Sequence, residues 1–266
     1  MIEKISKKKR LLGESLLVKN SQIYWLDIKK KKVFCNINNF ELKLQATPSV
    51  ILEKKNHLIV GTNKGIFFIK NKKLKKNISF NNLIDVKKFR LNDGCSLGKE
   101  KYLVGTMPLK HNSLFGTVYL IEKKKIFDLN LKIKIPNTFI RINKNTFLIS
   151  DSFCQKVYKV KISLQKKTIL SKKTVIKFNN KNTPDGGCLV PNGKIVLSMW
   201  NGSSVKIFNK DYTLYKTVKV PVKNPTNCKY DNLKDKLIVT SASLNSKKND
   251  LSGHTFAIKK FSCYFL

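Results

Sequence analysis

Four polar residues hold the same place in four of the six repeats of this 266-residue chain, and together they could carry chemistry. Each lies in a short phrase just before an aliphatic strand. The four residues are Glu14, Asn92, Asn137 and Asp185. If the repeats form a ring, equivalent places converge on its axis at one rim, and these side chains face a single cavity.

The chemistry that such a group suggests is the binding of a hard cation. Carboxylate and amide oxygens suit Ca²⁺, Mg²⁺ or Mn²⁺, with Zn²⁺ as a further candidate. Histidines offer no competing site, because His57, His111 and His254 lie far apart without HxxxH spacing. Each phrase taken singly also resembles an ordinary turn, since Asx and Gly residues are common turn formers. Four phrases at equivalent places are a stronger signal than one.

The elements that must position these residues are pairs of short strands. An aliphatic strand is followed by a small or polar break and a second strand, as in residues 58–62 with 66–68 and residues 102–106 with 118–120. Six copies recur at roughly 35 to 48 residues, near the propeller-blade period of about 40 to 50. The repeat predicts an all-β, six-bladed β-propeller that occupies 1–266 as a single domain. A β-barrel or sandwich is the alternative, but neither explains the repeat as well.

Eight of the sixteen acidic residues lie beside Lys or in polar turns, where we expect them to be solvated. Asp27 and Asp151 differ because each ends an apolar strand. A carboxylate in that place often accepts hydrogen bonds from neighbouring backbone N–H groups. We therefore expect both residues to be structural.

The net charge of +38 favours anionic ligands, but its pattern does not favour specific nucleic-acid binding. Nearly all of the charge is Lys, and the only arginines are Arg10, Arg90 and Arg141. Nucleic-acid readers usually use Arg for bidentate and stacking contacts. The lysines also recur in turn after turn rather than in one patch, so both compositional drift and functional anion attraction stay open.

Composition limits the remaining classes. No apolar run reaches the 18 residues of a membrane span, and Gly13 and Glu14 interrupt the apolar run that a signal peptide would need. The six cysteines are spread singly without a CxxC pair, so a zinc ribbon or redox motif is not expected. We expect a cytoplasmic protein that is a monomer or a weak homo-oligomer.

An ordered series of motifs resembles one family along nearly the whole chain. That family is the SMP-30/gluconolactonase/regucalcin-like group of six-bladed propeller lactonases. Single phrases are weak signals, but their order is specific. The motifs are Leu12-Gly13-Glu14 before Ile23-Tyr24-Trp25-Leu26-Asp27, Arg90-Leu91-Asn92-Asp93-Gly94 before Gly105-Thr106-Met107, Pro136-Asn137, Pro184-Asp185-Gly186, and Pro225-Thr226-Asn227-Cys228.

The resemblance implies a role for each candidate residue. Glu14, Asn137 and Asp185 would be the ligands of one divalent metal ion, and Asp185 would also be the catalytic acid/base. Arg90 and Asn92 would bind the substrate. The implied activity is metal-dependent opening of a sugar or aldonic lactone to the sugar acid, with a small-molecule lactone as the partner.

Three departures from the family pattern bear on the substrate pocket. Thr138 follows Asn137 where Gly is common, which could narrow the site or only alter the turn. The loop from Pro108 to Phe115 holds no acid where some members have a substrate-binding Glu, and Asn112 falls nearest to that place. Residues 15–17 replace a common Gly-Pro. The sugar therefore stays open.

Two readings from other classes stay open beside the enzyme. A non-catalytic propeller could bind a metal or a protein partner through its rim, and the absence of one ligand would favour it. A nucleic-acid-associated protein rests on charge alone and predicts steeply salt-dependent binding.

The charge also predicts how salt affects stability. Because fifty-four basic residues face sixteen acidic ones, self-repulsion destabilises the folded chain most at low ionic strength. We expect the Tm to rise by several degrees when ionic strength increases from about 0.01 M to about 0.15 M, where the Debye length falls to about 8 Å. Thermal denaturation at both salt concentrations measures this rise, and an unchanged Tm would contradict it.

Overall fold

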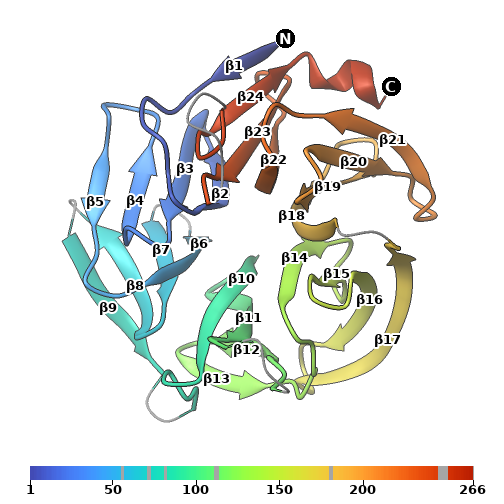
Figure 1. The fold of residues 1–266 in the computed structure, drawn as a ribbon. Helices are drawn as coiled ribbons and strands as arrows, with labels where there is room; N and C mark the ends of the chain where they lie inside the picture. The colour runs from blue at the N-terminus through green and yellow to red at the C-terminus, as the bar shows by residue number, and fades with distance from the viewer. Residues whose placement is uncertain are drawn as a thin grey trace. The chain divides into compact units, whose positions relative to one another are not determined.

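A computed structural model describes residues 1–54, 57–70, 73–80, 83–110, 114–179, 182–244 and 251–265. Its strands form six antiparallel sheets of four strands each. The sheets are the blades of a six-bladed β-propeller, which confirms the fold that the repeat predicted (Figure 1). No helix in the described ranges is long and apolar enough to cross a membrane.

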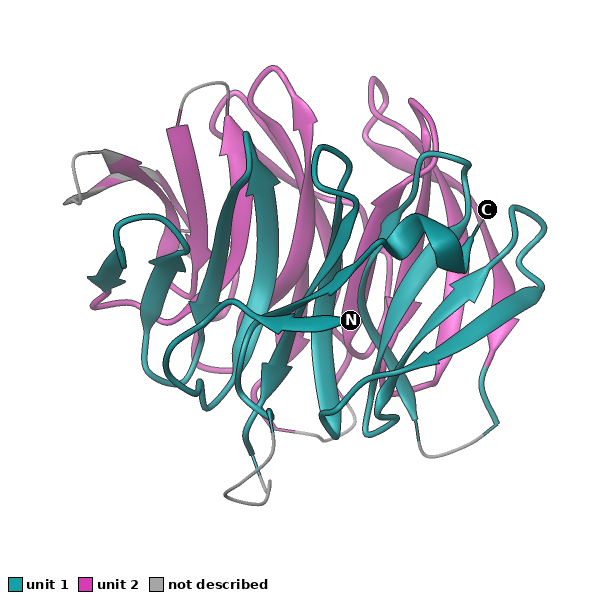
Figure 2. Ribbon diagram, turned by 90° about the horizontal axis from the view of Figure 1, so that it is seen from above, with its two compact units in different colours: residues 1–43, 178–266 teal, residues 44–177 magenta. Residues whose placement is uncertain are grey.

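The chain divides into two compact units, coloured separately in Figure 2. Unit 1 comprises residues 1–43 and 178–266, and unit 2 comprises residues 44–177. Each unit contains three blades. The single domain over 1–266 stays a prediction.

In unit 1, the first strand of the chain completes the last blade. The order of that sheet is β1-β24-β23-β22, so the two ends of the chain are joined by the pairing of β1 with β24. A short 3-10 helix, Phe261–Tyr264, follows β24. The strands of unit 1 are β1 (Ile2–Lys4), β2 (Gly13–Lys19), β3 (Gln22–Asp27), β4 (Lys32–Cys35), β5 (Glu41–Lys43), β18 (Thr183–Leu189), β19 (Ile195–Trp200), β20 (Ser204–Phe208), β21 (Leu214–Lys219), β22 (Asn224–Asp231), β23 (Lys236–Ala242) and β24 (Phe256–Lys259).

In unit 2, each blade uses four consecutive strands. They are β6 (Pro48–Lys54), β7 (His57–Thr62), β8 (Gly65–Lys70), β9 (Lys73–Ser79), β10 (Phe89–Gly98), β11 (Lys101–Pro108), β12 (Val118–Glu122), β13 (Lys125–Asp128), β14 (Pro136–Arg141), β15 (Thr146–Asp151), β16 (Lys156–Ser163) and β17 (Thr168–Lys177).

The cores lie where neighbouring blades pack face to face. The second and third strands of each blade are runs of aliphatic and aromatic residues, which suit sheets that are covered on both faces. Leu103, Leu120 and Phe147 come from two adjacent blades of unit 2, are fully buried and share one hydrophobic cluster. Burying one such side chain contributes about 1.5–3 kcal/mol.

The first strand of every blade carries a β-bulge near the same register position. The blades align on the pairs that join the first strand to the end of the second. These pairs are Gly13–Asp27, Pro48–Thr62, Leu91–Thr106, Pro136–Asp151, Pro184–Met199 and Pro225–Ser241. In each blade the bulge begins at this pair or one residue after it. The residue that follows the pair therefore lies in the bulge or directly before it.

Asp27 and Asp151 accept hydrogen bonds from backbone N–H groups, as the sequence predicted, and some of these groups lie just before two of the bulges. Asp27 accepts hydrogen bonds from the N–H groups of Leu11 (3.0 Å) and Leu12 (3.4 Å), directly before Gly13. Asp151 accepts from Lys134 (3.0 Å) in the same way, and also from Ile135, Phe153 and Cys154. Both carboxylates are buried. They fix the chain that leads into Glu14 in one blade and Asn137 in another.

Removing one of these carboxylates should destabilise the fold. Asp151→Ala leaves four backbone N–H groups without their acceptor, and we expect the free energy of unfolding to fall by about 1.5–3 kcal/mol. Urea denaturation measures the change. Asp211→Ala is the control, because Asp211 is an exposed turn residue and should change stability by only about 0.5 kcal/mol. Equal effects of the two substitutions would contradict the structural role of Asp151.

Candidate active site

Aligned on these register pairs, the six blades place one residue each at the same position, in the bulge or directly before it. These residues directly follow the six aligned pairs. All six are polar, which a purely structural bulge does not require. They are Glu14, Ser49, Asn92, Asn137, Asp185 and Thr226. The four candidates of the sequence analysis are thus equivalent in register, and two further residues join them.

Unit 2 brings Asn92 and Asn137 close together. The Asn92 side chain donates from Nδ2 to the carbonyl of Pro136 at 3.0 Å, so it touches the residue just before Asn137. Asn137 is buried, and its Nδ2 donates to Ser152 Oγ at 3.3 Å. Gly105 allows the close approach of β14, since a Cβ there would lie 2.6 Å from Cβ of Pro136. Both amide nitrogens thus donate to acceptors of the protein.

Asp93, next to Asn92, ties the two blades together. It is buried, and its Oδ2 accepts a hydrogen bond from the N–H of Phe139 at 3.4 Å. The bond joins β10, one residue after its aligned position, to β14, two residues after its aligned position. Asp93 therefore helps to hold Asn92 and Asn137 in place.

Thr138 explains one departure from the family pattern. Its backbone has φ +57°, a left-handed conformation that Gly adopts freely and that is strained for a β-branched residue. The side chain is fully buried, and its hydroxyl accepts a hydrogen bond from Ser150 Oγ at 3.0 Å. Thr138 thus keeps the turn that a Gly would make and packs its side chain within its own blade.

Arg90 lies two residues before Asn92 and is half-buried, opposite Met107 in the register of β10 and β11. Its Nη1 donates to the carbonyl of Leu91 at 2.9 Å. The predicted contact of Arg90 with a substrate stays a prediction. Asn112 and His111, from the loop without acids, lie outside the described residues.

In unit 1, Glu14 sits at the turn of its bulge. Its Oε2 accepts a hydrogen bond from the N–H of Ser15 at 3.1 Å, and Ser15 has φ +46°. The side chain is half-buried. The residue after Glu14 thus has the same left-handed backbone as the residue after Asn137, so the two bulges repeat one local geometry.

Asp185 is buried at the bulge of β18, and its neighbour Gly186 packs against Asn227. A Cβ at residue 186 would overlap Cγ and Nδ2 of Asn227. Asn227 is itself buried, and its Oδ1 has no hydrogen-bond partner among the described residues. An unpaired buried amide oxygen is costly, so it points to a missing donor or cation.

The last blade of unit 1 also contacts the residue before Glu14. Thr226 is fully buried and donates from Oγ1 to the carbonyl of Gly13 at 2.6 Å. Residues 226 and 227 therefore touch the immediate neighbours of both Glu14 and Asp185.

The sequence analysis gave no role to Ser49, Thr226 or Asn227. Ser49 is fully buried, and its hydroxyl has no partner within the described ranges. A signal was present: Pro48, Pro136, Pro184 and Pro225 each stand directly before the aligned position. A Pro followed by a polar residue just before an aliphatic strand would have added Ser49 and Thr226.

The residues fit a divalent cation by the chemistry of their donors. Glu14 and Asp185 carry carboxylates, Asn137 carries an amide, and the unpaired oxygen of Asn227 lies against Gly186, the residue after Asp185. No group of three or more His, Cys, Asp or Glu side chains gathers in the described parts of the chain. The candidate set is therefore one of carboxylates together with amides.

The chain matches the family described as SMP-30/Gluconolactonase/LRE-like region over residues 12–243. It therefore belongs to this family. No curated protein matches the chain.

Solved structures of the same fold include three whose names are informative. Regucalcin from Agrobacterium tumefaciens, described as a calcium-binding protein, is 19% identical with TM-score 0.86, covering 96% of this chain and 92% of that one. A luciferin-regenerating enzyme is 19% identical with TM-score 0.84, covering 97% and 95%. A gluconolactonase from Xanthomonas campestris is 12% identical with TM-score 0.77, covering 97% and 89%. At these identities the similarity shows the fold.

The contact of Gly186 with Asn227 yields a prediction. Gly186→Ala adds a Cβ where the Asn227 amide lies, and we expect the free energy of unfolding to fall by about 1–3 kcal/mol. Urea denaturation of Gly186→Ala, Asn227→Ser and the double variant tests the contact. Because serine makes room for the Cβ, alanine at residue 186 should cost much less in the Asn227→Ser background. Additive effects would show that the two residues do not share this space.

Proposed function

We propose that the protein is a divalent-metal-dependent hydrolase that opens a sugar or aldonic lactone to the open-chain acid. Membership of the family supports the reaction class. The observation that carries the proposal is the equivalence of Glu14, Asn92, Asn137 and Asp185 at the bulges of four blades. A shared metal site explains why carboxylates and amides recur where a bulge alone needs neither.

In this proposal Glu14, Asn137 and Asp185 hold one cation, chosen from Ca²⁺, Mg²⁺, Mn²⁺ or Zn²⁺. A bound cation supplies Lewis-acid polarisation of the lactone carbonyl and stabilises the negative charge that develops on its oxygen. The amide oxygen of Asn137 is a donor of the kind that hard cations prefer.

Asp185 acts as the acid/base. Its carboxylate takes a proton from the attacking water, and the protonated group then returns a proton to the alkoxide oxygen that leaves when the ring C–O bond breaks. One water is consumed and one carboxylic acid forms. The burial of Asp185 limits exchange with bulk water.

Arg90 and Asn92 orient the substrate. The guanidinium can donate to ring hydroxyls and to the carboxylate product, whose charge it complements. The net charge of +38 draws the same anion toward the protein, so product release rather than substrate capture would be sensitive to salt.

A propeller that binds a metal without catalysis is the second candidate. It is favoured by the description of the Agrobacterium tumefaciens regucalcin as a calcium-binding protein. The absence of an acid between Pro108 and Phe115 also favours it, since some family members place a substrate-binding Glu there.

Lactone hydrolysis followed with a pH indicator tests the proposal. The protein is stripped with a chelator, reconstituted with each of the four cations and assayed on a panel of sugar lactones. We expect metal-dependent turnover that falls by about 10²–10⁴-fold in Asp185→Asn. Asp231→Asn is the matched control, because Asp231 is a buried aspartate of the same unit outside the bulges, and its turnover should stay near wild type.

Binding and turnover separate the two candidates. Saturable metal binding without turnover on any lactone would favour the binding propeller. If Asp185→Asn retained full turnover, the assigned acid/base role would be wrong.

A further inference from the structure

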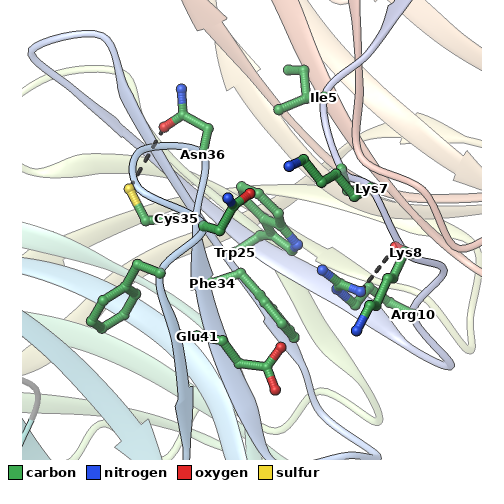
Figure 3. Close-up of a pocket in the computed structure, with 12 residues that line it drawn as sticks. Ile5, Lys7, Lys8, Arg10, Trp25, Phe34, Cys35, Asn36 and Glu41 are labelled. Carbon is green, nitrogen blue, oxygen red and sulfur yellow. Dashed lines mark hydrogen bonds between the residues drawn. The ribbon is translucent and has the colours of Figure 1, made fainter.

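A pocket in unit 1 is lined by none of the residues of the candidate active site. Its volume is about 360 Å³, within the range of small-molecule sites of about 300–1,000 Å³. The N-terminal segment between β1 and β2 forms one wall, and β3 with the β4–β5 connection forms the other (Figure 3). Six of the lining residues are basic or aromatic: Lys7, Lys8, Arg10, Trp25, Phe34 and Phe40.

Arg10 is a buried cation fixed in this wall. It is 8% exposed, and its Cζ lies 3.7 Å from the centre of the Phe34 ring. Its Nη1 donates to the carbonyls of Lys8 (2.9 Å) and Lys9 (3.4 Å). The guanidinium is therefore held in one orientation, as recognition of an anion requires.

One donor of Arg10 stays unused by the protein. Its Nε is buried without a hydrogen-bond partner among the described residues. Arg141 shows the contrasting case, because its Nε, Nη1 and Nη2 donate to the carbonyls of Asn143, Leu97 and Lys144. The guanidinium of Arg141 thus donates to backbone carbonyls from all three of its nitrogens, whereas Nε of Arg10 has no acceptor among the described residues.

Trp25 contributes a second unpaired donor to the same pocket. It is 2% exposed and stacks on Phe34 with ring centroids 5.9 Å apart. Its indole nitrogen has no partner within the described ranges, and in Figure 3 it lies on the side of the ring toward Arg10. Buried Trp N–H groups usually find an acceptor. Both nitrogens are buried, so a ligand acceptor reaches either of them only when the side chains around the pocket move apart.

The charges around the pocket favour an anion. Lys7 and Lys8 are exposed beside it, and its acid, Glu41, is paired with Lys32. Burial lowers the pKa of Arg10, and the carboxylates of Asp27 and Glu41 oppose this effect. A bound anion would offset more of the cost of burying the guanidinium.

We propose that this pocket binds a small organic anion, with a carboxylate or phosphate group on Arg10 and Trp25 and a flat ring against Phe40. Phe40 is half-buried at the pocket, so its ring offers an apolar face. Lys7 and Lys8 attract the anion to the entrance. The site is independent of the proposed lactone chemistry.

Fluorescence of Trp25 gives a direct readout. Trp25 and Trp200 are the two tryptophans of the chain, so Trp200→Phe leaves Trp25 as the single reporter. The probes are benzoate, adenosine monophosphate, inorganic phosphate and neutral benzamide, each titrated at about 0.15 M salt to screen the general charge of the protein. Benzoate and adenosine monophosphate distinguish carboxylate from phosphate as the preferred group.

We expect saturable one-to-one binding of benzoate or adenosine monophosphate, and at least tenfold weaker binding of inorganic phosphate and benzamide. Arg10→Lys keeps the charge but loses Nε and the planar fork, and should weaken binding by at least tenfold. Arg141→Lys is the matched control and should leave binding unchanged.

Lys8→Gln provides a second test if Arg10→Lys does not fold. It should weaken binding by about threefold, whereas the same change at Lys144 should not. Binding that does not saturate, or that Arg10→Lys and Arg141→Lys affect equally, would show adventitious attraction of anions to a basic protein and overturn the proposal. So would the failure of both organic anions to bind.

Discussion

In every blade, two residues of the first strand face one residue of the second strand. This bulge is the constraint on which the rest of the site depends. A regular strand alternates its side chains between the two faces of the sheet, so it cannot hold consecutive polar groups at one edge without breaking its core pattern. The bulge releases one or two residues from that alternation. Asp27 and Asp151 fix the chain before the bulges of β2 and β14, and Asp93 joins the bulge of β10 to that of β14.

Within one short strand, this arrangement lets the polar residue serve the candidate site while the residues after it pack in the core. Residues that follow the polar position enter the hydrophobic clusters between blades, as Leu16 and Val50 illustrate. The residue at the bulge is polar in all six blades. In two blades the residue after this position, Ser15 or Thr138, has a left-handed backbone with positive φ. Strained backbone of this kind is common at functional sites, where packing around it sustains the cost.

The strands and the ring could be predicted from the sequence because their aliphatic runs repeat at a blade-like period. The roles of Asp27 and Asp151 were also readable, since each ends an apolar strand. The register was not readable, because it depends on which residues pair across strands. Asn227 shows the difference: its sequence does not reveal that its amide packs against Gly186, the residue after Asp185. Likewise, the unused donor of Arg10 is a property of the fold.

The lysine-rich composition has a structural counterpart on the outer strands. Several lysine ammonium groups lie over aromatic rings, including Lys167 over Phe127 at 4.0 Å and Lys194 over Tyr215 at 4.3 Å. Lys172 lies 4.2 Å from the Tyr158 ring, and burial lowers its pKa. Such stems cover apolar surface while the charge stays near water. Much of the charge thus belongs to the surface of the blades.

The central claim is that one divalent cation is held jointly by Glu14, Asn137 and Asp185. Anomalous diffraction from crystals of the stripped protein soaked in Mn²⁺ tests it most directly. The account predicts one strong peak within coordination distance, about 2.0–2.6 Å, of oxygens from all three residues. No peak, or a peak that contacts none of them, would contradict the claim.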